Sequence, residues 1–119
     1  MPTSLLIVDD HASFRGFARS LLGEQGFDVA GEAEDGESAL EQVERLHPDV
    51  VLLDVQLPGI DGFEVAYRLS LGARPPRVVL TSSREAADFG DRLLLAPVAG
   101  FIAKRELSGS AFVELVRAG

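Results

Sequence analysis

Short apolar runs alternate with helical patterns along the whole chain. Short apolar runs predict five β-strands, at residues 5–8, 28–33, 50–53, 77–80 and 100–103. The first, third and fourth runs are almost continuously apolar, which is typical of strands buried on both faces of a parallel sheet. The pattern therefore predicts a parallel sheet whose strands are separated by helices.

Apolar residues recur at helical spacing between these strands. The predicted helices cover residues 14–22, 39–46, 61–69 and 84–95, and a last helix packs through 112–116. Asp61 followed by Glu64 predicts a capping box, and Ser108 or Ser110 is expected to cap the last helix. The helix over 84–95 is the weakest, because Gly90 lies inside it. Strand–helix alternation implies right-handed crossovers and a three-layer α/β sandwich, with residues 1–119 forming one domain.

The composition is that of a globular domain, with 46% hydrophobic and 25% charged residues among 119. No apolar run approaches the roughly 20 residues that a membrane span needs, and the first residues lack the pattern of a signal peptide. The absence of cysteine excludes disulfides, thiol catalysis and cysteine-ligated metals. We expect a cytoplasmic protein without membrane association.

The chain is acidic, with 19 Asp and Glu against 11 Lys and Arg and a net charge of −8. Such a surface repels phosphate backbones, so we expect no nucleic-acid binding by this domain. Part of the excess is expected to form a solvated loop and helix face, comprising Glu32, Glu34, Asp35, Glu37, Glu41 and Glu44.

Polar residues follow four of the predicted strands. Asp9 and Asp10 come after the first strand, Asp54 after the third, Thr81 after the fourth and Lys104 after the fifth. Ligands of open parallel sheets bind beyond the carboxyl ends of the strands, so we expect these side chains to converge there. Clustered carboxylates repel one another unless a cation neutralises them, and an open set of oxygen ligands favours Mg²⁺.

Each residue also has an ordinary structural interpretation when it is taken alone. Asp9 or Asp10 could cap a helix, as could Thr81, and Lys104 could be a surface lysine. His11 is expected to be an exposed residue at the start of a helix, without a role as metal ligand. The convergence of all these groups at one edge favours the functional interpretation.

An acidic pair followed in order by an Asp, a Thr and a Lys, each after a predicted strand, resembles the pattern of response-regulator receiver domains. The resemblance extends over all 119 residues. The segment 54–62, DVQLPGIDG, is similar to the loop that follows the phosphorylated Asp in that family. Phe101 lies three residues before Lys104, where the family has an aromatic switch residue. The resemblance implies a flavodoxin-like (βα)5 fold with strand order 2-1-3-4-5.

The resemblance also assigns the metal and the phosphoryl acceptor. Asp54 would be the nucleophile that becomes an aspartyl phosphate. Asp10, Asp54 and the backbone carbonyl of Gln56 would hold Mg²⁺ directly, and Asp9 would act mostly through a bound water. The domain would be a signalling module that catalyses its own phosphorylation and dephosphorylation, and is not otherwise an enzyme.

The remaining implied roles concern the response. Lys104 would pair with a phosphoryl oxygen, Thr81 would hydrogen-bond one after transfer, and Phe101 would then turn inward. The donor would be a sensor histidine kinase. The predicted helix over 84–95, the strand with Phe101 and the last helix would form a face for dimers or other partners. Helical spacing places Leu93 and Leu94 on the buried side with Phe89 and directs Leu95 away from the core. Local packing of this apolar segment under the next loop stays open as the alternative.

Other protein classes fit the sequence less well. A haloacid-dehalogenase-type enzyme needs a second Asp where this chain has Gln56. A flavin or nucleotide binder would not have two carboxylates after the first strand, and an EF-hand starting at Asp54 fails at Pro58 and Val65. The main alternative is a receiver-like interaction module that is not switched by phosphorylation. The residues after Thr81 and around Lys104, Arg105 and Glu106 are most similar to those of receivers with helix-turn-helix outputs. The sequence is compatible both with a stand-alone regulator and with a piece of a longer one.

Overall fold

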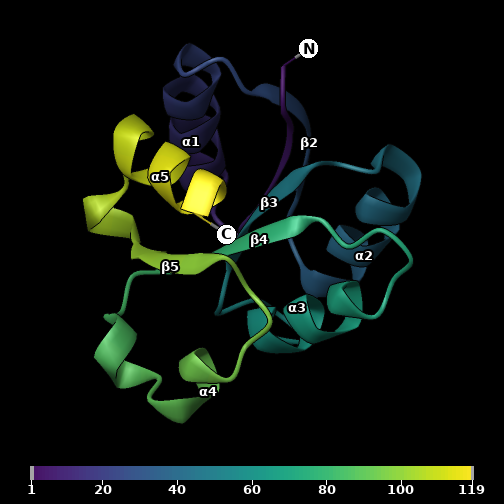
Figure 1. Ribbon diagram of the computed structural model, residues 1–119, viewed down its shortest axis with the longest axis vertical. Coiled ribbons are helices and arrows are strands. Elements are labelled where there is room, and N and C mark those ends of the chain that lie inside the picture. The colour runs from purple at the N-terminus through teal and green to yellow at the C-terminus, as the bar shows by residue number, and fades with distance from the viewer. Residues whose placement is uncertain (1, 119) are drawn as a thin grey trace.

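The computed structural model describes residues 2–118. Its strands form one parallel sheet in the order β2-β1-β3-β4-β5 (Figure 1), which confirms the predicted flavodoxin-like fold. The strands are β1 (Ser4–Val8), β2 (Asp28–Ala33), β3 (Val50–Asp54), β4 (Arg77–Ser82) and β5 (Gly100–Ala103). The helices are α1 (Ala12–Glu24), α2 (Gly36–Leu46), α3 (Gly62–Ser70), α4 (Asp91–Leu94) and α5 (Gly109–Ala118), with 3-10 turns η1 (Ala86–Asp88) and η2 (Lys104–Glu106).

Helices cover both faces of the sheet. α1 and α5 lie on one face, and α2, α3 and α4 lie on the other (Figure 1). Alternate residues of the central strands enter two separate cores, so that Leu5 and Ile7 pack with α1 and α5 while Leu6 and Val8 pack with α2 and α3. Because β1, β3 and β4 are buried on both sides, their sequences are nearly continuous apolar runs, as predicted.

Two central strands run further than predicted. β3 includes Asp54 and β4 includes Thr81 and Ser82, because the two strands remain paired there, with Asp54 opposite Thr81. The side chains of Asp54 and Thr81 are therefore fixed by strand geometry and not by a flexible loop.

The helix termini follow local capping chemistry. Asp61 accepts a hydrogen bond from the Glu64 N–H at 2.9 Å, which confirms this half of the predicted capping box, whereas the Glu64 carboxylate binds Arg68. Of the two predicted caps of α5, Ser108 accepts a bond from the Ala111 N–H. The longest described helix, α1, has 13 residues, and no helix within 2–118 is long and apolar enough to cross a bilayer.

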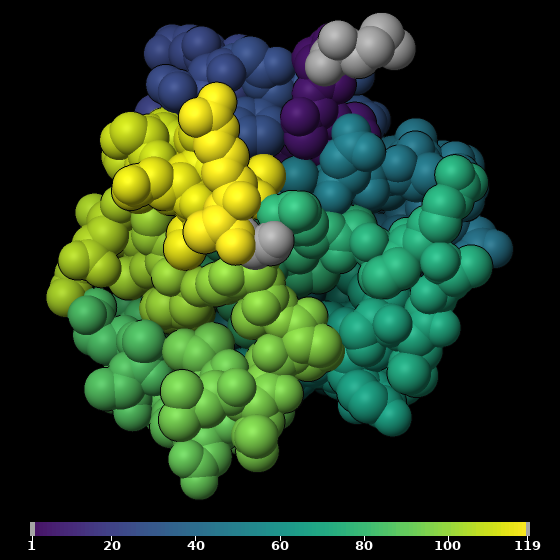
Figure 2. All heavy atoms as spheres, viewed as in Figure 1, coloured from purple at the N-terminus to yellow at the C-terminus, as the bar shows by residue number. Residues whose placement is uncertain are grey.

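The predicted helix over 84–95 is wrong. Gly90 adopts φ +55° and ψ −131°, outside the helical region, and separates the turn η1 from the short α4. One turn cannot present a buried stripe, so Leu94 is exposed (81%) together with Leu95 (83%), although Leu93 packs against the core as expected. This green segment forms the lower end of the molecule in Figure 2.

Candidate functional site

The carboxyl ends of the strands bring the predicted polar residues together. Asp9 follows β1, Asp54 ends β3, and Lys104 follows β5. The Lys104 Nζ lies 2.6 Å from Asp9 Oδ2 and 3.4 Å from Asp54 Oδ2. One ligand atom from each of Asp9, Asp10, His11 and Asp54 lies within 4.8 Å of the others. These four residues form the acidic cluster.

Asp54 is almost fully buried at the centre of the acidic cluster, with 3% of its surface exposed. Its Oδ1 accepts a hydrogen bond from the Gln56 N–H at 3.1 Å, and its Oδ2 faces Lys104. Burial and, secondly, the nearby charge of Asp9 raise the pKa of Asp54 from 3.8 to about 6, against the opposing effects of Lys104 and the Gln56 N–H. A site that concentrates negative charge in this way favours a cation.

The two carboxylates of the acidic pair have different surroundings. Asp9 is fully buried, and its Oδ1 accepts a 2.8 Å hydrogen bond from the His11 N–H, while its Oδ2 makes the ion pair with Lys104. The Asp10 side chain is 34% exposed. Neither residue caps α1, since the helix begins after His11 without a side-chain cap. The oxygen donors of the acidic cluster fit a hard cation, so the cluster can hold a metal ion.

Lys104 is not an ordinary surface lysine. Its side chain is only 18% exposed, and the Nζ lies 4.5 Å from the centre of the Phe14 ring in addition to its two carboxylate contacts. The aliphatic part of the side chain is thereby buried while the ammonium group faces Asp9 and Asp54.

Thr81 and Phe101 lie on neighbouring strands beside the acidic cluster. The buried Thr81 hydroxyl donates a 2.7 Å hydrogen bond to the carbonyl of Ile102, so Thr81 does not cap the segment after β4. The half-buried Phe101 ring packs edge-on against Phe89, and Phe89 packs in the same way against Phe63. The aromatic contacts therefore connect β5 to η1 and α3.

Sequence reasoning missed the contacts of three residues in or beside the acidic cluster. His11 is exposed at the start of α1 as expected, but its Nδ1 lies 3.1 Å from Asp9 Oδ1 and 3.0 Å from Asp10 Oδ1. Arg15 donates from Nη1 to the Asp9 carbonyl at 2.7 Å and from Nε to Glu32 at 2.9 Å. Glu32 was expected on a solvated face; its side chain is 29% exposed, but two arginines of α1 also bind it.

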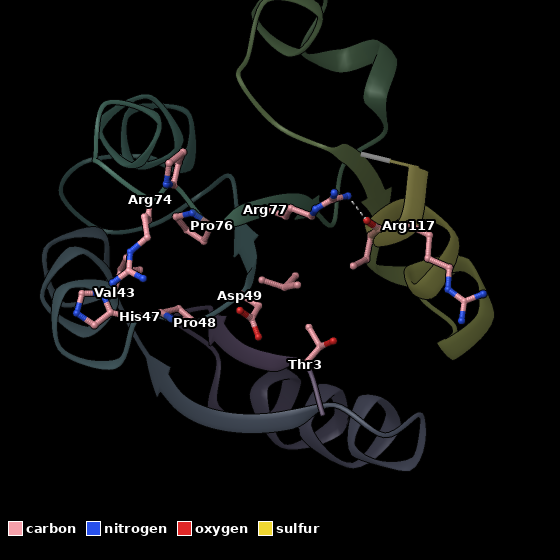
Figure 3. A pocket seen from close by; sticks show the side chains of 12 residues that line it. Thr3, Val43, His47, Pro48, Asp49, Arg74, Pro76, Arg77 and Arg117 are labelled. Atoms are coloured by element: carbon pink, nitrogen blue, oxygen red, sulfur yellow. Dashed lines mark hydrogen bonds between the residues drawn. The ribbon is translucent and has the colours of Figure 1, made fainter. Parts of the chain in front are cut away.

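A separate cavity of about 580 Å³ lies at the opposite edge of the sheet (Figure 3). Its lining includes Arg74 and Arg117, together with Arg77, which donates to the Val116 carbonyl. Thr3 and Asp49, before β1 and β3, also line it. The cavity is therefore remote from the acidic cluster, which lies beyond the other ends of the same strands.

The fold and the acidic cluster define a flavodoxin-like domain with a site suited to a cation. Residues 5–116 match the response regulator receiver domain family, and the chain therefore belongs to that family. It is a signalling domain of two-component systems.

Similar proteins agree with this assignment. The chain is 39% identical to the response regulator GacA of Pseudomonas viridiflava, over 96% of this chain and 52% of that protein. It is 33% identical to the transcriptional regulatory protein DegU of Brevibacillus brevis, over 95% of this chain and 48% of that protein. The signal receiver domain of NarL from Mycobacterium tuberculosis superposes with a TM-score of 0.85 at 33% identity, covering 99% and 98% of the two chains. The chain spans about half the length of the curated relatives that it matches.

Proposed function

We propose that the domain accepts a phosphoryl group on Asp54 from a phosphohistidine of a sensor histidine kinase and changes its partner-binding face in response. The observation that carries the proposal is the position of Asp54: buried at the end of a central strand, among other carboxylates, and 3.4 Å from a lysine ammonium. Phosphoryl transfer has a loose transition state, so a protein contributes mainly by positioning groups and offsetting charge, which is what this arrangement supplies.

The transfer step uses Asp54 as the nucleophile. A carboxylate oxygen of Asp54 forms a bond to phosphorus while the bond between phosphorus and the donor nitrogen breaks, and the electron pair leaves with the imidazole. Asp54 reacts as the ionised carboxylate, so no general base is required. The Lys104 ammonium, already beside Asp54, would pair with a phosphoryl oxygen as the group arrives.

The proposed metal is Mg²⁺. Asp10, Asp54 and the backbone carbonyl of Gln56 would hold it directly, and Asp9 would act mostly through water. When bound, Mg²⁺ supplies positive charge that stabilises the phosphoryl oxygens during transfer. The residues fit such an ion because their donors are oxygens, because Asp10 is accessible, and because a single lysine faces Asp9 and Asp54 within the described residues.

The proposed response begins at Thr81. Its hydroxyl would leave the Ile102 carbonyl and donate to a phosphoryl oxygen, and Phe101 would turn inward into the space that becomes free. Phe101 has no hydroxyl, so the ring itself must carry the signal. The face formed by α4, β5 and α5 would then favour a dimer or another partner, with the two arrangements differing by a few kcal/mol. A cytoplasmic location, and a DNA-binding output in a longer regulator, remain parts of this proposal.

The test is phosphorylation by a small acyl phosphate. Incubation with acetyl phosphate and Mg²⁺ should add one acid-labile phosphoryl group, seen by intact mass, and the addition should be lost in Asp54→Asn and after chelation of the metal. Asp49→Asn is the matched control, because Asp49 is an exposed aspartate at the opposite edge of the sheet and should not affect labelling. An unchanged mass, under conditions in which another receiver is labelled, would instead indicate an interaction module that is not switched by phosphorylation.

A further inference from the structure

Arg15 connects the loop that carries the acidic pair to strand β2. From the first turn of α1, its Nη1 donates to the Asp9 carbonyl oxygen at 2.7 Å and its Nε donates to Glu32 Oε1 at 2.9 Å. The Arg15 side chain is only 16% exposed. The guanidinium is rigid and planar, so the bond from Nε to Glu32 fixes the direction in which Nη1 donates to the Asp9 carbonyl.

The bond to the Asp9 carbonyl completes the fixation of that residue. The Asp9 N–H donates to the Ala33 carbonyl at 3.0 Å, and the Asp9 carboxylate accepts from the His11 N–H. The carbonyl belongs to the planar peptide that joins Asp9 to Asp10. Rotation of this peptide would change the direction in which the Asp10 side chain leaves the backbone, and Arg15 opposes that rotation.

Glu32 holds Arg15 in place and also binds a second arginine. Its Oε1 accepts from Arg15, and its Oε2 accepts from Arg19 Nε at 2.7 Å. Arg19 is one helical turn further along α1, and its side chain is 47% exposed. Both arginines therefore tie α1 to β2 through the same carboxylate, but of the two only Arg15 is bonded to the loop of the acidic cluster.

We propose that Arg15 is a positioning residue for cation binding: by holding the peptide between Asp9 and Asp10, it keeps the Asp10 carboxylate directed toward the carboxylates of Asp9 and Asp54. This inference rests on the proposed function of that cluster as a Mg²⁺ site. Arg15 makes its contact with the loop through the Asp9 backbone, so it acts through the orientation of the acidic pair and not by touching the metal or the phosphoryl group.

Charge and positioning predict opposite effects of removing this arginine. An arginine beside a cation site repels the cation, so a purely electrostatic role predicts that Arg15→Met binds Mg²⁺ more tightly. A positioning role predicts weaker binding, because the ligand loses its fixed direction. A merely structural role predicts a lower melting temperature and unchanged Mg²⁺ affinity.

The experiment measures the Mg²⁺ dissociation constant of the full chain by titration calorimetry and by backbone amide NMR shifts. Arg15→Met should weaken binding about tenfold, the lower end of the range for residues that orient a ligand. Arg19→Met is the matched control, since it removes the same charge and the other bond to Glu32; its Mg²⁺ affinity should stay within about twofold of wild type. Arg15→Lys keeps the charge but not the planar guanidinium, and should bind as weakly as Arg15→Met.

The outcomes separate the two proposals. A wild-type chain that binds no Mg²⁺ overturns the proposed function. A wild-type chain that binds Mg²⁺, with an Arg15→Met variant that binds as tightly or more tightly, overturns the positioning role alone. Equal losses in Arg15→Met and Arg19→Met would also overturn it, because they would assign the effect to Glu32 and the α1–β2 contact. If Arg15→Met does not fold, Arg15→Lys decides, and wild-type affinity in that variant overturns the role of the planar guanidinium.

Discussion

Adjacent aspartates do different work at the residue scale. Asp9 is fully buried, and its carboxylate already has partners in Lys104 and the His11 N–H, whereas Asp10 is partly exposed. The Asp9 carboxylate is thus already bound by groups of the protein, whereas the Asp10 carboxylate is accessible to an ion from solvent. This contrast agrees with the proposal that Asp10 is the direct ligand and Asp9 acts through water.

We therefore predict that Asp10→Asn weakens Mg²⁺ binding more than Asp9→Asn. Removing a direct ligand loses charge and coordination geometry together, whereas residues acting through water typically contribute about 10–100-fold in affinity. The measurement is a Mg²⁺ titration of both variants followed by amide NMR, with Asp49→Asn as the control for loss of one negative charge. A larger loss in Asp9→Asn would reverse the assignment of the two residues.

Thr81 and Lys104 allow the response to be separated from the chemistry. The Thr81 hydroxyl donates its hydrogen bond to the Ile102 carbonyl, so Thr81→Ala should still accept a phosphoryl group. It should respond weakly, and the lost buried hydrogen bond should lower the unfolding free energy by about 1 kcal/mol. Lys104→Ala removes the ammonium beside Asp54 and should lose response and part of the transfer rate.

Two measurements check this prediction. Beryllofluoride, which imitates a phosphoryl group on Asp54, should shift the amide NMR signals of α4 and β5 in the wild type and shift them much less in both variants. Labelling by acetyl phosphate should be slowed mainly in Lys104→Ala. Full beryllofluoride-induced shifts in both variants would contradict the roles of both residues.

At the scale of elements, the β3–α3 connection depends on a glycine directly behind Asp54. A Cβ on Gly62 would lie 2.4 Å from the Asp54 carbonyl oxygen and 2.8 Å from the Val55 Cα, and backbone atoms cannot move aside as a flexible side chain can. The Gly62 N–H also donates to the Val55 carbonyl at 2.8 Å. The start of α3 is thus packed against the backbone that positions the proposed phosphoryl acceptor.

Gly62→Ala should consequently lower the unfolding free energy by about 1–3 kcal/mol, the usual cost of overpacking. Gly16 is the matched control, because it lies inside α1 and, apart from its chain neighbours and the backbone of its own helix, no atom lies within 4 Å of its would-be Cβ. Gly16→Ala should raise the unfolding free energy by about 0.5–1 kcal/mol, since alanine favours the helix. Urea denaturation measures both variants, and equal effects would contradict the close approach at Gly62.

The elements also show what the sequence could and could not predict. Strands buried on both faces leave continuous apolar runs, and the strand-end rule then located Asp9, Asp54, Thr81 and Lys104 correctly. The helix over 84–95 was mispredicted because composition alone does not show that Gly90 leaves the helical region. The ion pair between Arg15 and Glu32 was missed because the two residues are 17 positions apart in sequence. Their contact depends on how α1 packs against β2, which the sequence pattern does not show.

At the scale of the whole molecule, the exposed apolar side chains are distributed unevenly. Leu94, the last residue of the short α4, and the adjacent Leu95 lie together at the lower end of the molecule (Figure 2). Phe89, which precedes α4, packs against Phe101 on β5. Phe101 is followed directly by Ile102, whose carbonyl accepts the hydrogen bond from Thr81, the residue opposite Asp54 in the sheet. A change at Asp54 could therefore reach this apolar pair across one strand and one aromatic contact.

We predict that beryllofluoride and Mg²⁺ promote a dimer through the face formed by α4, β5 and α5. Leu95→Glu should abolish the dimer, because an unpaired charge buried at an interface costs several kcal/mol. Leu71→Glu is the matched control: Leu71 is similarly exposed, at 69%, but follows α3, outside the proposed face. Sedimentation velocity of each protein, with and without beryllofluoride, measures the effect. A dimer that survives Leu95→Glu, or is lost equally in Leu71→Glu, would place the interface elsewhere, and a wild-type monomer in both states would remove the dimer while leaving the receiver family assignment intact.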